Sequence, residues 1–125
     1  MPLPSPFHAR TADLCTSLKW KTWAGTFAAA SYGTDPESEF HAIRQTVAMI
    51  DVSPRYKVDV LGPDAASFLA RVTSKDVTKL ERGRCAYVCL CDDDGKLLDV
   101  GMLSYLDDQL FRLTTSAANL GWLND

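Results

Sequence analysis

Alternating apolar and polar residues between positions 56 and 61 predict a half-buried β-strand. Further apolar runs of strand length follow at residues 85–91, 97–105 and 110–115. The first two of these runs are joined by an acidic turn that ends in Gly95, and Asp-Gly between apolar runs is a hairpin signal because glycine accepts positive φ. Asp107 and Asp108 make the next turn. We therefore expect antiparallel strands.

Helical patterns lie on both sides of the first strand. Asp35 can cap the free backbone N–H groups of a helix that starts with Pro36 and ends near Met49. Its apolar residues recur every three or four positions and predict one buried face: Phe40, Ile43, Val47 and Ile50. A second helix is predicted at residues 65–71, and residues 117–123 begin a last helix or turn. Together these elements predict an α+β fold with an antiparallel sheet and two or three helices.

The N-terminal part shows a weaker pattern. Residues 1–17 contain three prolines and no clear period, so we expect an extended arm there. Residues 18–25 include Trp20 and Trp23 and are expected to form a short strand or turn that places aromatic surface on a core.

Composition narrows the class of protein. A chain of 125 residues with 46% apolar and 23% charged residues is typical of one globular domain, or part of one. The net charge of −3 argues against a nucleic-acid partner. No apolar run reaches the roughly 20 residues of a membrane helix, so no membrane partner is expected. The N-terminus lacks a charged start followed by an apolar core, so it is not a secretory signal.

The cysteines favour a reduced, cytoplasmic setting. Cys85, Cys89 and Cys91 share one face of a predicted strand with Tyr87, and neighbours on a strand are poorly placed to form a disulfide. A zinc site would need a Cys-x-x-Cys pair or a nearby histidine, so we expect no metal and interpret these cysteines as small hydrophobic core residues. The aspartates at residues 92–94 lack the other spaced ligands of a calcium loop and are expected to form a solvated turn.

Asp99 is the candidate with the strongest chemical interest, because it interrupts an apolar strand and a charge there must be paired or used. The residues leave two interpretations open. The carboxylate either reaches solvent or caps a backbone group, or it lies in a cleft and binds a cationic or N–H-bearing ligand. Tyr87 across the hairpin and Met102 as an adaptable apolar wall would then line the pocket.

Several motifs, in order from Glu39 to the C-terminus, resemble the aminomethyltransferase, or glycine-cleavage T-protein, superfamily. They lie at residues 39–44, 51–54, 57–69, 73–80, 83–87, 94–99 and 111–119. Beside the aminomethyltransferase, that superfamily includes folate-dependent demethylases and the folate domains of sarcosine and dimethylglycine oxidases.

The resemblance implies a tetrahydrofolate-binding α+β fold in which a one-carbon unit passes from a heteroatom of a small-molecule donor to folate. It implies that an acidic residue after the Asp-Gly hairpin is the main catalytic group, and Asp99 is the candidate here. Tyr87 and Arg55 would line the cofactor site, together with Val100 and Met102. Such a carboxylate would hold and orient the folate amine during transfer.

The chain also departs from the family pattern. The family often has two consecutive aspartates, of which the second is the principal carboxylate, whereas this chain has Asp99 followed by Val100. Either Asp99 substitutes for the usual acid, or the chain is a non-catalytic folate-binding or assembly module. Gly101 and residues 114–116 look closer to the demethylase and oxidase branch.

Family members are considerably longer than this chain. We therefore expect residues 1–125 to be the N-terminal portion of such a folate-binding domain, as a fragment or a small subunit. On this interpretation a partner chain or self-association completes the fold, and the surface to be covered is the one formed by Leu120, Trp122 and Leu123.

Overall fold

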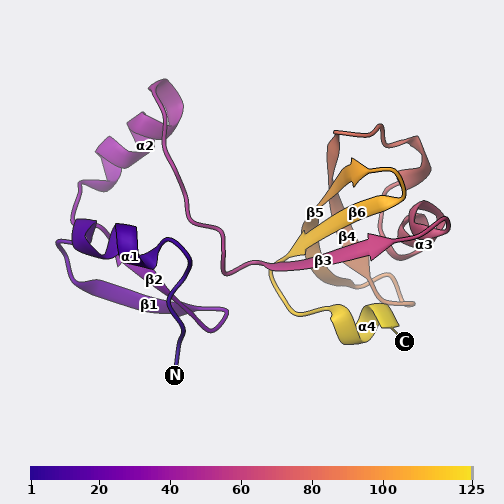
Figure 1. Cartoon of the computed structure of the whole chain (residues 1–125), viewed down its shortest axis with the longest axis horizontal. Helices are drawn as coiled ribbons and strands as arrows, with labels where there is room; N and C mark the ends of the chain where they lie inside the picture. The colour runs from indigo at the N-terminus through magenta and orange to yellow at the C-terminus, as the bar shows by residue number, and fades with distance from the viewer. Residues whose placement is uncertain (125) are drawn as a thin grey trace. The chain divides into compact units, whose positions relative to one another are not determined.

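The computed structural model describes residues 1–124, and the chain divides into two compact units. Unit 1 is Met1–Pro54 and unit 2 is Arg55–Asp125. Figure 1 shows helices and antiparallel strands in both, which confirms the predicted α+β class. Residues 1–124 include four α-helices, rather than the two or three predicted. None of these helices is both long enough and apolar enough to cross a membrane.

Unit 1 is built on a hairpin with short helices on either side. Its elements are α1 (His8–Thr11), the 3-10 helix η1 (Ala12–Leu14), β1 (Lys19–Trp23), β2 (Thr26–Ser31) and α2 (Pro36–Gln45). β1 and β2 pair antiparallel, as the strand interpretation of residues 18–25 allowed. The extended arm expected for residues 1–17 is wrong between His8 and Leu14, which are helical. All three prolines precede this stretch, so no missing N–H group interrupts it.

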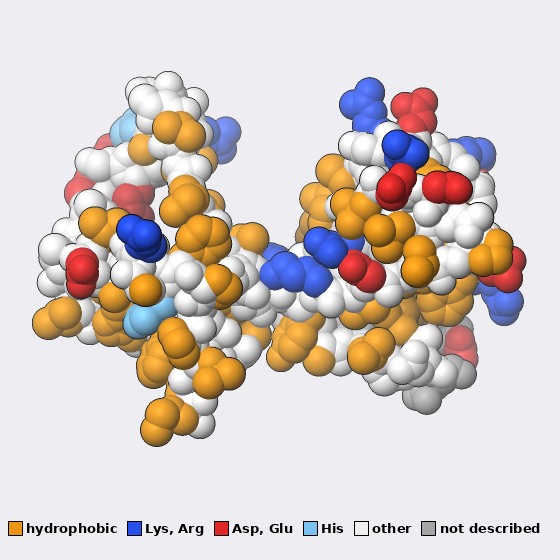
Figure 2. All heavy atoms as spheres, in the orientation of Figure 1, with side chains coloured by type: hydrophobic (Ala, Val, Ile, Leu, Met, Phe, Trp, Pro, Cys, Tyr) orange, Lys and Arg blue, Asp and Glu red, His pale blue; other side chains and the backbone are white. Residues whose placement is uncertain are grey.

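The start of α2 is as predicted, but its end and its burial are not. The Asp35 carboxylate accepts a hydrogen bond of 3.0 Å from the backbone N–H of Ser38. The helix ends at Gln45 instead of near Met49. The side chains predicted to form its buried face are exposed, namely Phe40, Ile43, Val47 and Ile50. Figure 2 shows hydrophobic side chains at the surface along the segment after α2.

Unit 2 is a four-stranded antiparallel sheet with the strand order β3-β6-β5-β4. Its elements are β3 (Tyr56–Leu61), α3 (Ala65–Val72), η2 (Val77–Lys79), β4 (Cys85–Cys91), β5 (Leu97–Asp107), β6 (Leu110–Thr115) and α4 (Leu120–Asn124). All four strands lie where the alternation and the apolar runs predicted them, and β5 runs two residues further than residue 105. α3 confirms the helix predicted at residues 65–71, and α4, which begins at Leu120, confirms the helical alternative for residues 117–123.

One face of this sheet, which we call the inner face, carries the core. Its buried strand residues pack with α3 and η2, and the cluster consists of Ala65, Leu69, Val77, Ala86, Val88, Leu90, Leu103, Phe111 and Leu113. Because successive side chains of a strand point to opposite sides, the residues between these positions form the outer face.

The segment between α3 and η2 lies along the free edge of β4. Thr73 forms an isolated antiparallel bridge with Leu90. The backbone N–H of Ser74 donates to the carbonyl of Cys89, and the N–H of Cys89 donates to Ser74 Oγ, both at 3.0 Å. The edge of β4 is therefore covered at this point.

Candidate functional site

The outer face of β4 and β5 brings together the predicted cofactor residues of the hairpin. Tyr87 is paired with Met102, and Cys89 is paired with Val100. The Tyr87 side chain is 65% exposed and that of Met102 is 39% exposed. Thr114 of β6 continues the Tyr87–Met102 row. The hairpin thus presents an aromatic ring beside an apolar, adaptable side chain on an open surface.

Arg55 lies on the same face, at the opposite edge of the sheet, next to β3. The β3–β6 register ends at the pair Tyr56–Thr115, so Arg55 comes just before β3 and Ser116 just after β6. Arg55 Nη1 donates a hydrogen bond of 3.1 Å to Ser116 Oγ. Thr115 is buried on the inner face, and strand alternation therefore turns Ser116 to the outer face. The sheet brings all four predicted cofactor residues to one face.

An ion pair borders the same face. Arg112 Nε and Nη2 donate to the two carboxylate oxygens of Asp59 at 2.7 and 2.9 Å. Ser104 lies opposite Arg112 in the neighbouring strand. The guanidinium hydrogen bonds lower the pKa of Asp59 more than its slight desolvation raises it, so this carboxylate stays ionised.

Asp99 lies on the opposite side from Tyr87. It is paired with Leu90, which is fully buried on the inner face. Asp99 Oδ2 accepts hydrogen bonds from the backbone N–H groups of Ser116 (3.2 Å) and Ala117 (2.9 Å) and from Asn119 Nδ2 (2.9 Å). Its Oδ1 accepts from the N–H of Val100 at 2.7 Å.

These contacts set the charge of Asp99. Burial raises the pKa of Asp99. The hydrogen bonds from Ala117, Asn119, Val100 and Ser116 together lower it by more than burial raises it, so the net pKa is below the ordinary value. The carboxylate is half-buried and ionised, with Oδ2 bound to the turn after β6 and Oδ1 bound to the N–H of Val100 in β5. Of the two sequence interpretations, this geometry matches the cap of backbone groups. A catalytic role for Asp99 remains a prediction.

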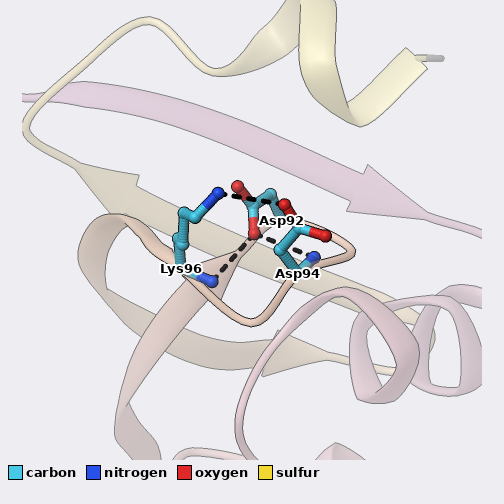
Figure 3. Close-up of polar contacts among 3 residues, drawn as sticks. All are labelled: Asp92, Asp94 and Lys96. Atoms are coloured by element: carbon cyan, nitrogen blue, oxygen red, sulfur yellow. Dashed lines mark hydrogen bonds and ion pairs between the residues drawn. The ribbon is translucent and has the colours of Figure 1, made fainter.

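The turn between β4 and β5 is held by its own residues (Figure 3). Asp92 Oδ1 accepts from the backbone N–H groups of Asp94 (3.1 Å) and Lys96 (2.8 Å). Lys96 Nζ pairs with Asp94 Oδ2 at 2.9 Å. In residues 1–124, no three His, Cys, Asp or Glu side chains are grouped so that they could hold a metal ion. The turn fixes the hairpin that carries the outer face.

The β4 cysteines do not lie in the core as predicted. Cys85 is exposed, whereas Cys89 and Cys91 are half-buried. Cys85 and Cys89 alternate with Ala86, Val88 and Leu90, so the strand period assigns the core to those three residues instead. The buried cysteine is Cys15 of unit 1, and all four thiols are free.

Sequence reasoning missed Ser116 and Asn119. Both follow the last strand, and their link to Arg55 and Asp99 joins residues 17 to 61 positions apart. The pattern of β6 could have placed Ser116 on the outer face, but only the strand pairing places it beside Arg55.

Two shallow hollows lie elsewhere. One of about 270 Å³ in unit 2 is lined mainly by the β3–α3 connection, including Gly62, Pro63 and Phe68. The other, of about 370 Å³ in unit 1, lies beside Trp20 and Phe27. Neither hollow is lined by Tyr87, Val100, Met102 or Arg55.

Comparison with known proteins identifies the family. A family model described as the GCVT N-terminal domain matches residues 7–123, which is most of the chain. The chain belongs to the GCVT N-terminal domain family. The resemblance seen in the sequence is thereby confirmed.

Relatives of this GCVT N-terminal domain include proteins of two kinds. An aminomethyltransferase of Methylococcus capsulatus is 41% identical over 92 residues, covering 70% of this chain and 26% of the relative. The heme-dependent oxidative N-demethylase gamma subunit of Ectopseudomonas mendocina is 37% identical over 90 residues, covering 72% of this chain and 24% of the relative. The chain spans about a quarter of the length of these curated relatives.

A solved structure confirms the fold of the domain. The glycine cleavage system aminomethyltransferase T from Bartonella henselae superposes with a TM-score of 0.77 over 98% of this chain and 33% of that protein. At 23% identity this match establishes the fold alone.

Proposed function

We propose that the chain supplies a tetrahydrofolate-binding sheet face to an aminomethyl- or methyltransferase-like protein that passes a one-carbon unit from a heteroatom of a small donor to folate. The observation that carries this proposal is the convergence of Tyr87, Met102, Val100 and Arg55 on one face of unit 2. Membership of the GCVT N-terminal domain family and the relatives named aminomethyltransferase support it.

The residues of the outer face fit a flat heteroaromatic ligand with polar edges. The exposed Tyr87 ring offers a stacking surface, and Met102 can adapt to the ligand beside it. Arg55 uses one N–H group on Ser116 and has further donors for a carbonyl or carboxylate. Tetrahydrofolate would supply the nucleophilic nitrogen that accepts the one-carbon unit. The surface is open, so a partner chain or a further segment would have to exclude water from it.

A second candidate function, a non-catalytic folate-binding or assembly module, is favoured by one specific observation. Val100 occupies the outer-face position opposite Cys89, two residues before Met102, whereas the Asp99 carboxylate is engaged on the inner side. An uncharged isopropyl group can contact a ligand but cannot orient an amine through its charge.

Calorimetric titration of the chain with tetrahydrofolate tests the binding part of the proposal. We expect heat of binding for the wild type, and we expect Tyr87→Ala to weaken binding by roughly tenfold because one stacking surface is lost. Tyr56→Ala, on the inner side of the same sheet, is the matched control and should bind as the wild type does. Absence of binding heat at high micromolar concentration would overturn the proposal for this chain.

Transfer assays separate the two candidates. If the chain is part of a transferase, one-carbon transfer to tetrahydrofolate is measurable. Val100→Asp then raises the transfer rate, because it places a carboxylate on the outer face. In the non-catalytic module, tetrahydrofolate binds but transfer is undetectable in the wild type. Val100→Asn is the control for the size and polarity of the new side chain.

A further inference from the structure

The Asp99 carboxylate and the turn after β6 form a cluster that we call the Asp99 clamp: Asp99, Ser116, Ala117 and Asn119. Three donors converge on Asp99 Oδ2, namely two consecutive backbone N–H groups and the Asn119 side-chain amide. The clamp thus joins a β5 residue to the segment that leaves the sheet. Hydrogen bonds to an ionised group are about twice as strong as neutral ones, so the clamp holds this turn firmly.

Other hydrogen bonds within this turn use the Ala117 carbonyl, to which the Asn119 N–H also donates, and not the N–H groups of Ser116 and Ala117. β6 ends at Thr115, so the N–H groups of Ser116 and Ala117 lie beyond the last ladder pair, Tyr56 with Thr115. Both residues are exposed. Thr115 Oγ1 donates to the carbonyl of Ala117 at 2.8 Å, which tightens the same turn from the inner side. Without Asp99, water would be the alternative acceptor for both N–H groups.

Ser116 connects the clamp to the outer face. Its backbone N–H donates to Asp99 on the inner side, whereas its hydroxyl accepts from Arg55 Nη1 on the outer side. The position of the Ser116 backbone therefore determines where the hydroxyl lies and, through it, how the guanidinium is oriented. Long side chains lose considerable rotamer entropy when they are ordered, so an arginine fixed in advance binds its ligand more tightly.

We propose that Asp99 is a positioning residue of the outer face: it fixes the turn after β6 so that Ser116 holds the Arg55 guanidinium ready for a carbonyl or carboxylate of the ligand. This inference rests on the proposed folate-binding function. It assigns to Asp99 an action through Ser116 and Arg55, without contact to the reacting atoms.

Amide exchange in the ligand-free chain tests the clamp itself. In Asp99→Asn, NMR-detected hydrogen exchange of the Ser116 and Ala117 amides should accelerate by roughly tenfold, because the charged acceptor is lost. The Arg55 Nε–H signal should show a lower order parameter. Asp92→Asn removes an aspartate that also caps two backbone N–H groups but lies in the β4–β5 turn, and it should leave all three signals unchanged. Unchanged signals in Asp99→Asn would overturn the inference.

A double-mutant cycle with Arg55 tests the link to the ligand. We expect Asp99→Asn and Arg55→Gln each to weaken tetrahydrofolate binding by roughly tenfold, and the double variant to lose no more than Arg55→Gln alone. Ser116→Ala keeps the backbone clamp but removes the hydroxyl, so it should match Arg55→Gln in binding while its amides stay protected. This variant also guards against a folding defect in Asp99→Asn.

Distinct outcomes separate failure of this inference from failure of the proposed function. Additive losses of binding free energy in the cycle would overturn the positioning role. So would a fall of the saturated transfer rate with unchanged KM in Asp99→Asn, which would indicate that Asp99 takes part directly in catalysis. If the wild type binds no tetrahydrofolate, the proposed function fails, and the amide and Arg55 signals alone then decide whether the clamp positions the guanidinium.

Discussion

At the scale of single residues, the order of Asp99 and Val100 determines what the outer face can do. The two are neighbours in β5, so one lies on the inner side with Leu90 and the other on the outer side with Cys89. The sequence predicted that a carboxylate in this strand must be paired or used. The sequence could not predict which face of the sheet the carboxylate takes. A shift of register by one residue exchanges the two faces, and the register depends on pairing with β4.

The lowered pKa of Asp99 predicts a pH-dependent stability. The folded-state pKa lies below the unfolded-state value of about 3.9, so ionised Asp99 stabilises the fold above that pH. The contribution is lost as the pH falls through the folded-state pKa. Urea unfolding between pH 7 and pH 2 should therefore show a shallower acid decline in Asp99→Asn than in the wild type.

Asp93→Asn, in the exposed turn between β4 and β5, is the control for removal of one negative charge. Its acid decline should match that of the wild type. Parallel curves for Asp99→Asn and the wild type would contradict the stabilising role of the Asp99 hydrogen bonds.

At the scale of elements, local sequence patterns predicted where helices and strands form, but they did not predict that the apolar side of α2 is exposed. Period-two alternation located β3, and apolar runs bounded by turn signals located β4, β5 and β6. The same kind of reasoning predicted a buried face for α2, yet Phe40 and Ile43 are exposed. An amphipathic pattern states that a helix has an apolar side, but what covers that side depends on other elements.

β5 also contains a position that tolerates no side chain. A Cβ atom on Gly101 would lie 2.8 Å from the carbonyl oxygen of Thr114 and 3.1 Å from Thr115 Cγ2. Gly101→Ala should therefore force β5 and β6 apart and lower the free energy of unfolding by about 1–3 kcal/mol. Denaturant titration measures this loss. Gly121→Ala in α4, where a Cβ meets nothing within 4 Å, is the control, and an equal effect in both variants would refute the steric explanation.

At the scale of the whole molecule, the core belongs to unit 2. Every residue of the buried cluster lies between Ala65 and Leu113. In the described part of unit 1, the buried residues are Ser5, Cys15 and Pro54. Overall length and composition were consistent with one domain. They carry no information on how buried positions divide between the two halves of the chain, so the two-unit organisation was not predictable from them.

This division predicts that unit 2 folds on its own and that unit 1 does not. A fragment of residues 55–125 should unfold cooperatively in urea, followed by circular dichroism, because it retains the whole buried cluster. A fragment of residues 1–54 should show no cooperative transition, since a two-stranded hairpin with few buried side chains is marginal in water. A non-cooperative 55–125 fragment would show that unit 2 depends on unit 1 for its fold.

The contact between Ser74 and β4 has a consequence for assembly. A bare edge strand is a template on which another chain can add a strand and begin to aggregate. Ser74 occupies both backbone groups of Cys89, so β4 offers no template there, close to Tyr87. The predicted self-association would therefore not extend the sheet from β4 at Cys89. The outer face can thus stay open to a small ligand while its β4 edge is closed to another polypeptide strand at Cys89.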